Sequence, residues 1–382
     1  MSLLSGIFKK DNTVNYYSSQ ALKVLNSFFN SNSGAYKMTE LVNAYATNPI
    51  VFSIINYITG ISDGLEKQLL NNDTEIESGD VYDVLKGLNE ELLYTNLLST
   101  GNAFLRLIKG VGMGAEFEVL NSKDVEILLN ANGTVKGYKY CIGNTDVNYL
   151  EEEILHIKFS NIVKTDEYNM HYGYSPLEAG MKIVTASSEI FNAEASIFKN
   201  RGVVGMLSND SDMPMLPKEQ EAIQEAFQEK AGGSDKFNKV LVTSANAKYV
   251  QMGMSPSDLQ LIDNQLSKLR FLCSLYGIDS KLLGDGANST YNNVKEAQKN
   301  AYINTILPLT KRVNNTLIKF LNKEYSTQFT YEVNLSKVEA LKEQQTLEQL
   351  ILEAIAEKDL ELEDLIAIQK GTYNIEDNEQ GV

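Results

Sequence analysis

The sequence predicts an α+β chain, and three observations carry that prediction. The first is a pair of long helices, expected at 176–200 and 256–276, separated by a compact insert. Each opens on a Ser-Pro start signal, Ser-Pro-Leu-Glu at 175–178 and Ser-Pro-Ser-Asp at 255–258, with proline where its missing N–H does no harm. The second is a run of short strand-like segments between 103 and 159. The third is another long helix that carries Pro308 in its interior.

Composition indicates an ordinary globular protein. The chain has 382 residues, 43% of them hydrophobic, and a mean hydropathy of -0.23, so we expect two or three subdomains. No apolar run approaches the roughly eighteen residues that span a bilayer, which predicts no membrane partner. The first ten residues lack the hydrophobic stretch of a secretion signal. Cys141 and Cys273 form no metal or redox motif, so we expect a reduced, intracellular chain.

The negative charge is placed unevenly along the chain. The net charge is -16, and residues 336–382 alone hold 12 acidic and 4 basic side chains, whereas residues 175–335 hold 17 of each sign. Binding to a nucleic-acid backbone through counterion release requires clustered lysine and arginine side chains, which an acidic chain does not favour. Such a surface indicates solubility, or non-adhesion to a polyanion if another partner brings DNA close.

The N-terminal half predicts an arm followed by an α+β unit. Residues 1–47 are polar, with a short amphipathic piece around 21–29, and we expect an arm. Asn48-Pro49 caps a helix at 50–61, and a second helix covers 78–99. Strands are then expected at 103–109, 115–120, 124–130, 134–142 and 154–159. Residues 48–174 therefore read as two helices followed by an antiparallel meander.

The two long helices carry heptad-like apolar seams. The seam positions are Val184, Ser188, Phe191, Ala195 and Phe198 on the first helix and Leu259, Ile262, Leu266, Leu269, Cys273 and Tyr276 on the second. Such seams pack at a shallow angle. Small residues on the other faces of the first helix suit side-by-side packing of several copies. The alternative, which composition alone favours, is a helical hairpin inside a single monomer.

The remaining segments have simpler readings. The insert, 201–255, predicts strands at 203–208, 239–243 and 248–252 around a helix at 217–230. A glycine-bearing loop at 278–290 leads to the third helix, 291–321, where Pro308 predicts a kink near Thr305. A strand is expected at 328–333. A capping box at 336–339 opens a C-terminal helical region that ends near 371.

The sequence offers no enzyme signature. The only histidines, His156 and His171, have no partner at ligand spacing, and the glycine-rich stretch 110–114 lacks the strand–turn–helix context of a phosphate loop. No nucleophile elbow, His-Glu-x-x-His or Cys-x-x-Cys occurs. We therefore expect no catalytic residues, no metal and no cofactor.

At this point the chain resembles the portal proteins of long-tailed bacteriophages. The pieces that carry the resemblance keep the family's order over roughly 45–335: Asn-Pro-Ile-Val-Phe at 48–52, Ile-Ile-Asn at 54–56, Ser-Thr-Gly-Asn-Ala-Phe-Leu at 99–105, Glu-Ile-Leu-His-Ile at 153–157, Tyr-Gly-Tyr-Ser-Pro-Leu at 172–177, Phe-Lys-Asn-Arg-Gly at 198–202, Tyr-Gly-Ile at 276–278, Leu-Leu-Gly-Asp at 282–285, and a helix from Asn-Asn-Val at 292–294 to Leu-Pro at 307–308. The chain departs from the family in having no tryptophan and few arginines.

The resemblance implies a subunit architecture. It assigns an N-terminal arm to 1–47, an α/β wing to 48–174, a two-helix stem to 175–200 and 256–277, and a small α/β clip to 201–255. Residues 278–290 would be the tunnel loop, and 291–335 the long kinked helix with a return strand to the wing. Residues 336–382 would be a helical crown and tail.

The resemblance also implies a function without chemistry. It implies a ring, typically of about twelve copies, at one capsid vertex, through which double-stranded DNA passes without sequence specificity during packaging and ejection. The implied partners are the terminase large subunit, the head–tail adaptor, and the major capsid or scaffold protein. The implied location is the virion, after synthesis in the bacterial host cytoplasm.

Two groups of residues are the candidate sites. We expect the loop Gly284, Asp285, Gly286, Ala287, Asn288 and Ser289 to form the tunnel loop, with Asp285, Asn288 and Ser289 at the narrowest point and the glycines allowing it to shift. Lys182, Lys199, Lys268 and Arg270 would face the channel or pair with acids of a neighbouring copy.

Two other functions stay open at this stage. One is a different structural or adaptor protein of a virus or a virus-derived particle. The other is an enzyme with an unrecognised α/β site, for example a nucleotide transferase. The lack of clustered histidine, cysteine or paired carboxylates argues against it.

Overall fold

The computed structural model describes residues 36–72, 74–110, 114–163, 169–199, 205–209, 247–251, 261–286 and 290–341, with the single residues 218, 221 and 225. Its longer helices are α2 (Met38–Thr47), α3 (Pro49–Asp63), α4 (Asp80–Lys86), α5 (Glu90–Thr100), α6 (Pro176–Lys199), α8 (Leu261–Leu275), α9 (Tyr291–Ala301) and α10 (Leu307–Tyr325). Its strands are β1 (Lys67–Asn71), β2 (Thr74–Ile76), β3 (Asn102–Lys109), β4 (Ala115–Leu120), β5 (Val125–Leu129), β6 (Val135–Ile142), β7 (Thr145–Leu150), β8 (Ile154–Lys158), β9 (Gly205–Asn209), β10 (Ala247–Gln251) and β11 (Thr330–Val333).

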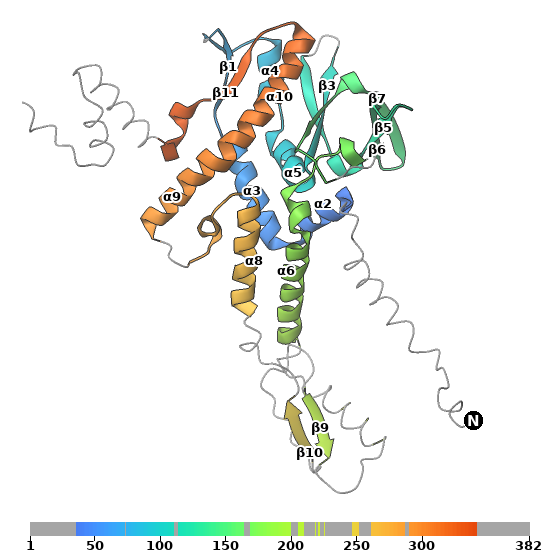
Figure 1. Cartoon of the computed structure of the whole chain (residues 1–382), viewed down its shortest axis with the longest axis vertical. Helices are drawn as coiled ribbons and strands as arrows, with labels where there is room; N and C mark the ends of the chain where they lie inside the picture. The colour runs from blue at the N-terminus through green and yellow to red at the C-terminus, as the bar shows by residue number, and fades with distance from the viewer. Residues whose placement is uncertain are drawn as a thin grey trace, which may run out of the picture.

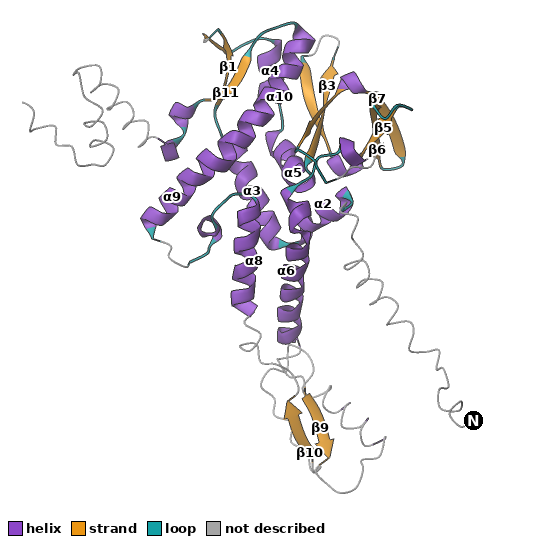
Figure 2. Ribbon diagram, in the orientation of Figure 1, coloured by secondary structure: helices purple, strands orange, loops and turns teal. Residues whose placement is uncertain are grey.

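The described elements make a broad mixed body with a long projection (Figure 1). Helices α6 and α8 leave the body side by side, and the two-stranded sheet of β9 and β10 lies beyond their far ends. Figure 2 shows that the body gathers helices at its centre and strands along its upper edge and one flank. Helix and sheet are therefore mixed within one chain, as the sequence predicts.

Three antiparallel sheets of three strands lie in the body, in the orders β4-β3-β8, β5-β6-β7 and β11-β1-β2. In the first, Leu105 at the centre of β3 lies opposite Val119 on one side and Leu155 on the other. The third sheet joins distant parts of the chain, since Lys67 of β1 lies opposite Val333 of β11. The chain therefore returns after α10 to the sheet beside its first helices.

The helices differ from the predicted ones in three places. One is the start of the expected C-terminal helical region: the expected capping box at 336–339 opens no α-helix among the described residues, and Val338 is extended between two 3₁₀ turns, Leu335–Lys337 and Glu339–Leu341. Residues 38–47, expected in the arm, form α2, whose Leu41 and Ala44 are buried. The single helix expected at 78–99 is two helices, α4 and α5. Gly87 ends the first, and the side chain of Asn89 caps the second by accepting from the Leu92 N–H at 3.0 Å. Gly87 and Asn89 are ordinary stop and start signals two residues apart, which an apolar pattern running across both helices conceals.

Three of the described strands, β1, β2 and β7, are not predicted from the sequence. Strand β7 and the two strands of the hairpin β1–β2 are three to six residues long. Asn72 in the turn between β1 and β2 has a φ of 47°, a conformation that asparagine tolerates well. Such short, half-exposed strands have too little periodicity to identify them.

Two of the three hydrophobic cores in the described body contact the long helical segment. The first packs α3 against the near ends of α6 and α8, with Ile54, Ile58, Leu177 and Leu272 among its fully buried members. The second packs α4, α5 and β3 against α10, which contributes Val313, Leu317 and Leu321. Because the two cores share the long helical segment that ends in α10, the projection is fixed to both.

A tight backbone contact connects the central sheet to the start of α6. Gly173 lies so close to Gly101 that a Cβ at position 173 would come within 2.1 Å of the Gly101 carbonyl oxygen. The Asn102 carboxamide oxygen accepts from the Gly173 N–H at 2.6 Å, and the Ser175 hydroxyl donates to the Ser99 carbonyl at 2.9 Å. Only glycine fits at this crossing.

His156 is a structural residue beside this crossing. Its Nε2 lies 3.0 Å from the Asn102 carboxamide oxygen, which accepts, so Nε2 carries the proton. Its ring stacks on Phe104 with centroids 4.2 Å apart. Burial, with the nearby positive charge of Lys158 adding to it, lowers the pKa of His156 to about 3.

This burial predicts an acid-sensitive fold. As the pH falls, the unfolded chain protonates this histidine before the folded chain does, because the pKa is lower in the folded state. The contribution of neutral His156 to the free energy of unfolding is therefore complete above about pH 6.5 and is lost as the pH falls toward 3. We expect the free energy of unfolding to fall by up to about 1.4 kcal/mol per pH unit within that window. Denaturant titrations should show a shallower acid slope in His156→Gln. The matched control His171→Gln should keep the wild-type slope, and equal slopes in wild type and His156→Gln would contradict the assignment.

Candidate functional site

The candidate site is the projecting helix pair, whose ends nearest the body are deeply buried. Leu177 on α6 and Leu272 and Cys273 on α8 have no exposed surface. The helices approach most closely at Gly180, where a Cβ would lie 2.7 Å from the Leu275 side chain. Farther out, the Gln265 amide donates to the Glu194 carboxylate at 2.6 Å. A small residue at the inner end thus brings the two rods together.

The predicted seams are partly right. Phe191 and Leu269 pack against the core, and Val184, Cys273 and Tyr276 are buried. On α8, however, Ile262 is 76% exposed, whereas Leu272, outside the predicted seam, is fully buried. Leu259 and the side chain of Phe198 lie outside the described residues. Near the body the buried stripe of α8 is therefore wider than the heptad seam, because α3 covers a second face of the helix.

Helix α8 ends in a defined turn that faces the long helix. The Ile278 N–H donates to the Cys273 carbonyl and the Gly277 N–H to that of Ser274, at 3.0 and 3.1 Å, which is the Schellman pattern. Gly277 has a φ of 70°, as that motif requires. Its carbonyl accepts from the Thr305 hydroxyl at 2.6 Å. The end of the rod is thereby tied to the segment that carries the predicted kink.

That segment contains a π-helical turn, Tyr302–Ile306, between α9 and α10. The Leu307 N–H donates to the Tyr302 carbonyl five residues back, and Pro308 is the second residue of α10. Proline cannot donate to the preceding turn, and a wider turn is one way to accommodate it. The irregularity expected near Thr305 thus takes the form of a π-turn, and Thr305 is the residue that contacts α8.

The glycine loop is held against α8 by an ion pair that the sequence does not reveal. Arg270 donates to the Asp285 carboxylate twice, from Nε to Oδ2 at 2.6 Å and from Nη2 to Oδ1 at 3.0 Å. The Ser280 hydroxyl donates to Oδ2 at 2.8 Å. The Asp285 side chain is 4% exposed and that of Arg270 is 48% exposed. The carboxylate raises the pKa of Arg270, which stays charged.

This pair shows how Asp285 lies in the loop. Its carboxylate turns toward Arg270 and Ser280 and is buried, and its place at the narrowest point of a channel stays a prediction. Arg270 pairs with an acid of its own chain, which neither alternative for it foresaw. Gly284, with a φ of 89°, ends the short 3₁₀ helix Ser280–Leu283, and Gly286 is exposed. Ala287, Asn288 and Ser289 lie outside the described residues.

The other candidate charges have no common arrangement. Lys182 on α6 is exposed and Lys268 on α8 is half-buried. The side chain of Lys199 lies outside the described residues. Whether these lysines face a channel or a neighbour stays a prediction.

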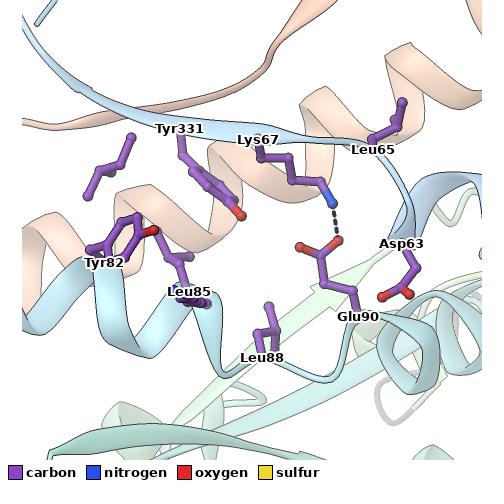
Figure 3. Close-up of a pocket in the computed structure, with 10 residues that line it drawn as sticks. Asp63, Leu65, Lys67, Tyr82, Leu85, Leu88, Glu90 and Tyr331 are labelled. Atoms are coloured by element: carbon purple, nitrogen blue, oxygen red, sulfur yellow. Dashed lines mark hydrogen bonds and ion pairs between the residues drawn. The ribbon is translucent and has the colours of Figure 1, made fainter. Parts of the chain in front are cut away.

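A second charged site lies in the body, where Figure 3 shows the Lys67 ammonium pointing at the Glu90 carboxylate. They line a cavity of about 230 Å³ together with Tyr331, and both side chains are at most 10% exposed. Lys67 also donates to the Ser62 carbonyl at 3.0 Å. Burial raises the pKa of Glu90, although the ammonium opposes the shift. The two opposite charges thus compensate each other, and we interpret Lys67 and Glu90 as a structural ion pair.

The titratable groups offer little reactivity. Burial raises the pKa of the Cys273 thiol to about 12, which keeps it protonated. Within the described part of the chain, no group of three or more histidine, cysteine, aspartate or glutamate side chains is placed to hold a metal ion. No described helix is long and apolar enough to cross a membrane.

The comparisons identify the family. The family model described as phage portal protein matches residues 90–356, well over half of the chain. The chain therefore belongs to the phage portal protein family. Portal proteins are structural components of phages and phage-like particles, and this family is not enzymatic.

Solved structures share the fold. The chain superimposes on a component of the neck of an empty GTA particle, solved with C6 symmetry, with a TM-score of 0.65, 22% identity, and coverage of 88% of this chain and 94% of the other. A component of the neck of the native GTA particle with C12 symmetry gives 0.62, 22%, 87% and 94%. An HK97 family phage portal protein from Corynebacterium diphtheriae gives 0.53, 13%, 77% and 94%.

Two curated relatives are similar over most of their length. An uncharacterized protein of Rickettsia bellii (strain RML369-C) is 24% identical over 81% of this chain and 83% of its own. An uncharacterized protein of Rickettsia felis (strain ATCC VR-1525 / URRWXCal2) is 23% identical over 79% and 81%. Both similarities extend over most of this chain, as does the match to the family model.

Removing the loop's ion pair should loosen the loop without unfolding the body. In Arg270→Ala the buried Asp285 carboxylate loses its cation, and since Arg270 is half-exposed we expect only a small loss of stability. Hydrogen exchange should rise at the amides of 280–286. Arg270→Lys, which keeps charge without the two-pronged contact, should be intermediate. Lys268→Ala is the control, and protection unchanged in Arg270→Ala would contradict the role.

The Lys67–Glu90 pair should behave as a coupled unit. Lys67→Met or Glu90→Leu alone leaves a buried unpaired charge and should cost about 3–5 kcal/mol. The double variant should recover much of that loss, because neither charge then remains buried. Chemical denaturation of the four proteins measures the coupling. Additive losses would show that the two side chains act independently.

Proposed function

We propose that the chain assembles into a closed ring of twelve copies that forms the DNA channel at one vertex of a phage or phage-like capsid. Family membership over residues 90–356, joined to the projecting α6/α8 pair, is the observation that carries this proposal. The similar folds found in GTA necks solved with C6 and C12 symmetry support a copy number divisible by six. Closed cyclic symmetry gives each copy two unlike neighbours.

In this ring each part of the chain has a role. Residues 48–174 form the wing, α6 and α8 the stem, 201–255 the clip, and 278–290 the tunnel loop. Residues 291–335 form the long helix and the strand that returns to the wing, and the pairing of β11 with β1 supports that return. Residues 336–382 form the crown. The clip docks the terminase large subunit first and the head–tail adaptor later, while the wing meets the capsid or scaffold protein.

The charge balance suits passage of DNA. A chain of net charge -16, with equal numbers of positive and negative side chains over 175–335, presents little counterion-releasing surface to a polyanion. Double-stranded DNA then slides through the channel without sequence-specific grip. The site of action is the virion, after synthesis in the bacterial cytoplasm.

A gene-transfer particle is the second candidate setting. The GTA neck structures match with TM-scores of 0.62 and above, against 0.53 for the phage portal. In that setting the ring and channel are the same, and only the origin of the packaged DNA differs.

Native mass spectrometry of the purified protein tests the proposal. We expect a dominant species of twelve times the 42.6-kDa chain, and a ring with an axial hole in negative stain. Failure to retain duplex DNA at physiological salt should accompany it. A chain that stays monomeric at high concentration would contradict the proposal.

A further inference from the structure

A groove of about 340 Å³ lies between α10 and the edge of the sheet β11-β1-β2. One wall is the apolar face of the long helical segment, with Leu307 and Pro308. The other wall is formed by three successive residues of β11, 331–333. Successive side chains of a strand point to opposite faces of the sheet. Three successive residues of β11 therefore line the same groove because the groove follows the edge of the strand. The groove therefore runs along the edge of β11 that faces away from β1, with which no described strand pairs.

The open edge of β11 presents peptide groups to this groove. The Asn334 N–H donates to the Glu66 carbonyl at 2.9 Å, which makes 334 and 66 a hydrogen-bonded pair of the antiparallel ladder. Hydrogen-bonded and non-hydrogen-bonded pairs alternate along an antiparallel ladder. The backbone N–H and C=O groups of Glu332 therefore point at β1, whereas those of Tyr331 and Val333 point away from β1. Because β11 is the outermost strand, these groups are available to another strand.

A buried amide completes the site. Asn314 on α10 lines the groove and is 1% exposed, yet neither its Nδ2 nor its Oδ1 has a hydrogen-bond partner in the described structure. Buried polar side chains nearly always have partners, and an amide's donor and acceptor match the two groups of a peptide unit. The groove thus has the features of an acceptor for an extended peptide: an open strand edge, an apolar wall and an unpaired amide.

Two segments of this chain could supply that peptide, and their sequences favour the N-terminal one. Residues 1–35 hold three lysines and one aspartate, whereas residues 342–382 hold 11 acidic and 3 basic side chains in a molecule that is already acidic. Thr-Val-Asn-Tyr-Tyr at 13–17 is rich in strand-forming residues, while 343–370 is rich in glutamate, leucine and alanine, which favour helix.

The placement of the arm favours a neighbouring copy. The described chain begins at Tyr36, whose N–H donates to the Glu178 carboxylate at 3.2 Å near the start of α6. Figure 1 shows α2, which follows, on the flank opposite α9 and the adjoining end of α10. In a ring of head-to-tail contacts, opposite flanks of adjacent copies meet. The residues between 17 and 36 reach up to roughly 60 Å when extended, which is ample to cross.

We propose that residues 13–17 of one copy add a strand to β11 of the next copy, in the groove closed by α10 and with Asn314 bonded to the incoming backbone. This inference rests on the proposed ring. It makes the arm a strap between adjacent subunits, so that the ring is held by exchanged strands as well as by helix packing.

Disulfide trapping in the full-length ring tests the strap. In a Cys141→Ser background, Glu332→Cys on the exposed face of β11 is combined with Asn15→Cys, Tyr16→Cys or Tyr17→Cys. Under mild oxidation we expect at least one pair to give a ladder of crosslinked dimers and higher species. The matched control replaces Glu332→Cys by Glu75→Cys on β2, the opposite edge of the same sheet, and should give none. Ile375→Cys with Glu332→Cys tests the C-terminal tail as the occupant.

The amide supplies a second, independent readout. Asn314→Leu should raise the melting temperature of the monomeric subunit, because it removes an unsatisfied buried group, and lower the crosslink yield about fivefold, because the incoming strand loses its partner. A purely structural asparagine would not shift the two readouts in opposite directions.

The outcomes separate this inference from the function on which it rests. Rings that give no arm-to-β11 ladder overturn the strap and leave the portal ring standing. Crosslinks confined to single chains, or a ladder equally strong with β2 or with the tail, also overturn it. A wild-type chain that is only monomeric overturns both.

Discussion

Among the described residues, the position of the two long helices α6 and α8 depends on the packing of their ends nearest the body. Helices α6 and α8 extend well beyond the body, so their position is determined by the packing of their inner turns. There, Leu177 and Leu272 are wholly buried against α3, and Gly180 lets the rods approach within side-chain contact. The Tyr276 hydroxyl adds a buried hydrogen bond to the Leu98 carbonyl at 3.2 Å. Close packing at this end transmits rigidity to a projection that has little core of its own.

The same end connects the rods to the rest of the proposed machine. Through Gly277 and Thr305, α8 contacts the π-turn of the long helix, and through Arg270 and Asp285 it holds the first half of the glycine loop. The long helix then runs into the second core and leads to β11. A displacement of α8 would therefore move both the loop and the long helix. These direct contacts couple the proposed stem to the proposed tunnel loop.

Much of the fold could be read from sequence, and the failures have physical causes. Helix starts with proline and a cap, and strands with clear alternation, were predicted close to their observed bounds, because these signals are local. The break at Gly87 and Asn89 was hidden by a continuous apolar pattern. The short strands β1, β2 and β7 carry almost no periodicity of their own, and β1 pairs with a strand more than 250 residues away.

The role of the candidate site stays a prediction, and the structure adds contacts that the sequence does not indicate. Of the two loop glycines, Gly284 has a left-handed backbone with a φ of 89°, whereas Gly286 does not. Nothing in the spacing of Arg270 and Asp285 indicates that the 3₁₀ helix between them folds the carboxylate back onto α8, since such a contact depends on tertiary geometry. Likewise, the exposed Ile262 and the buried Leu272 show that a heptad pattern fixes a seam only until a third helix covers another face.

A cryo-electron microscopy map of the assembled protein tests the central claim most directly. The account predicts a rotationally symmetric ring whose axial channel is walled by α6 and α8 from every copy, with the 284–289 loop at its constriction and the Asp285 carboxylate turned back toward Arg270. A map that places these helices on the outer rim, or that shows a channel walled by the β5-β6-β7 sheet, would contradict it.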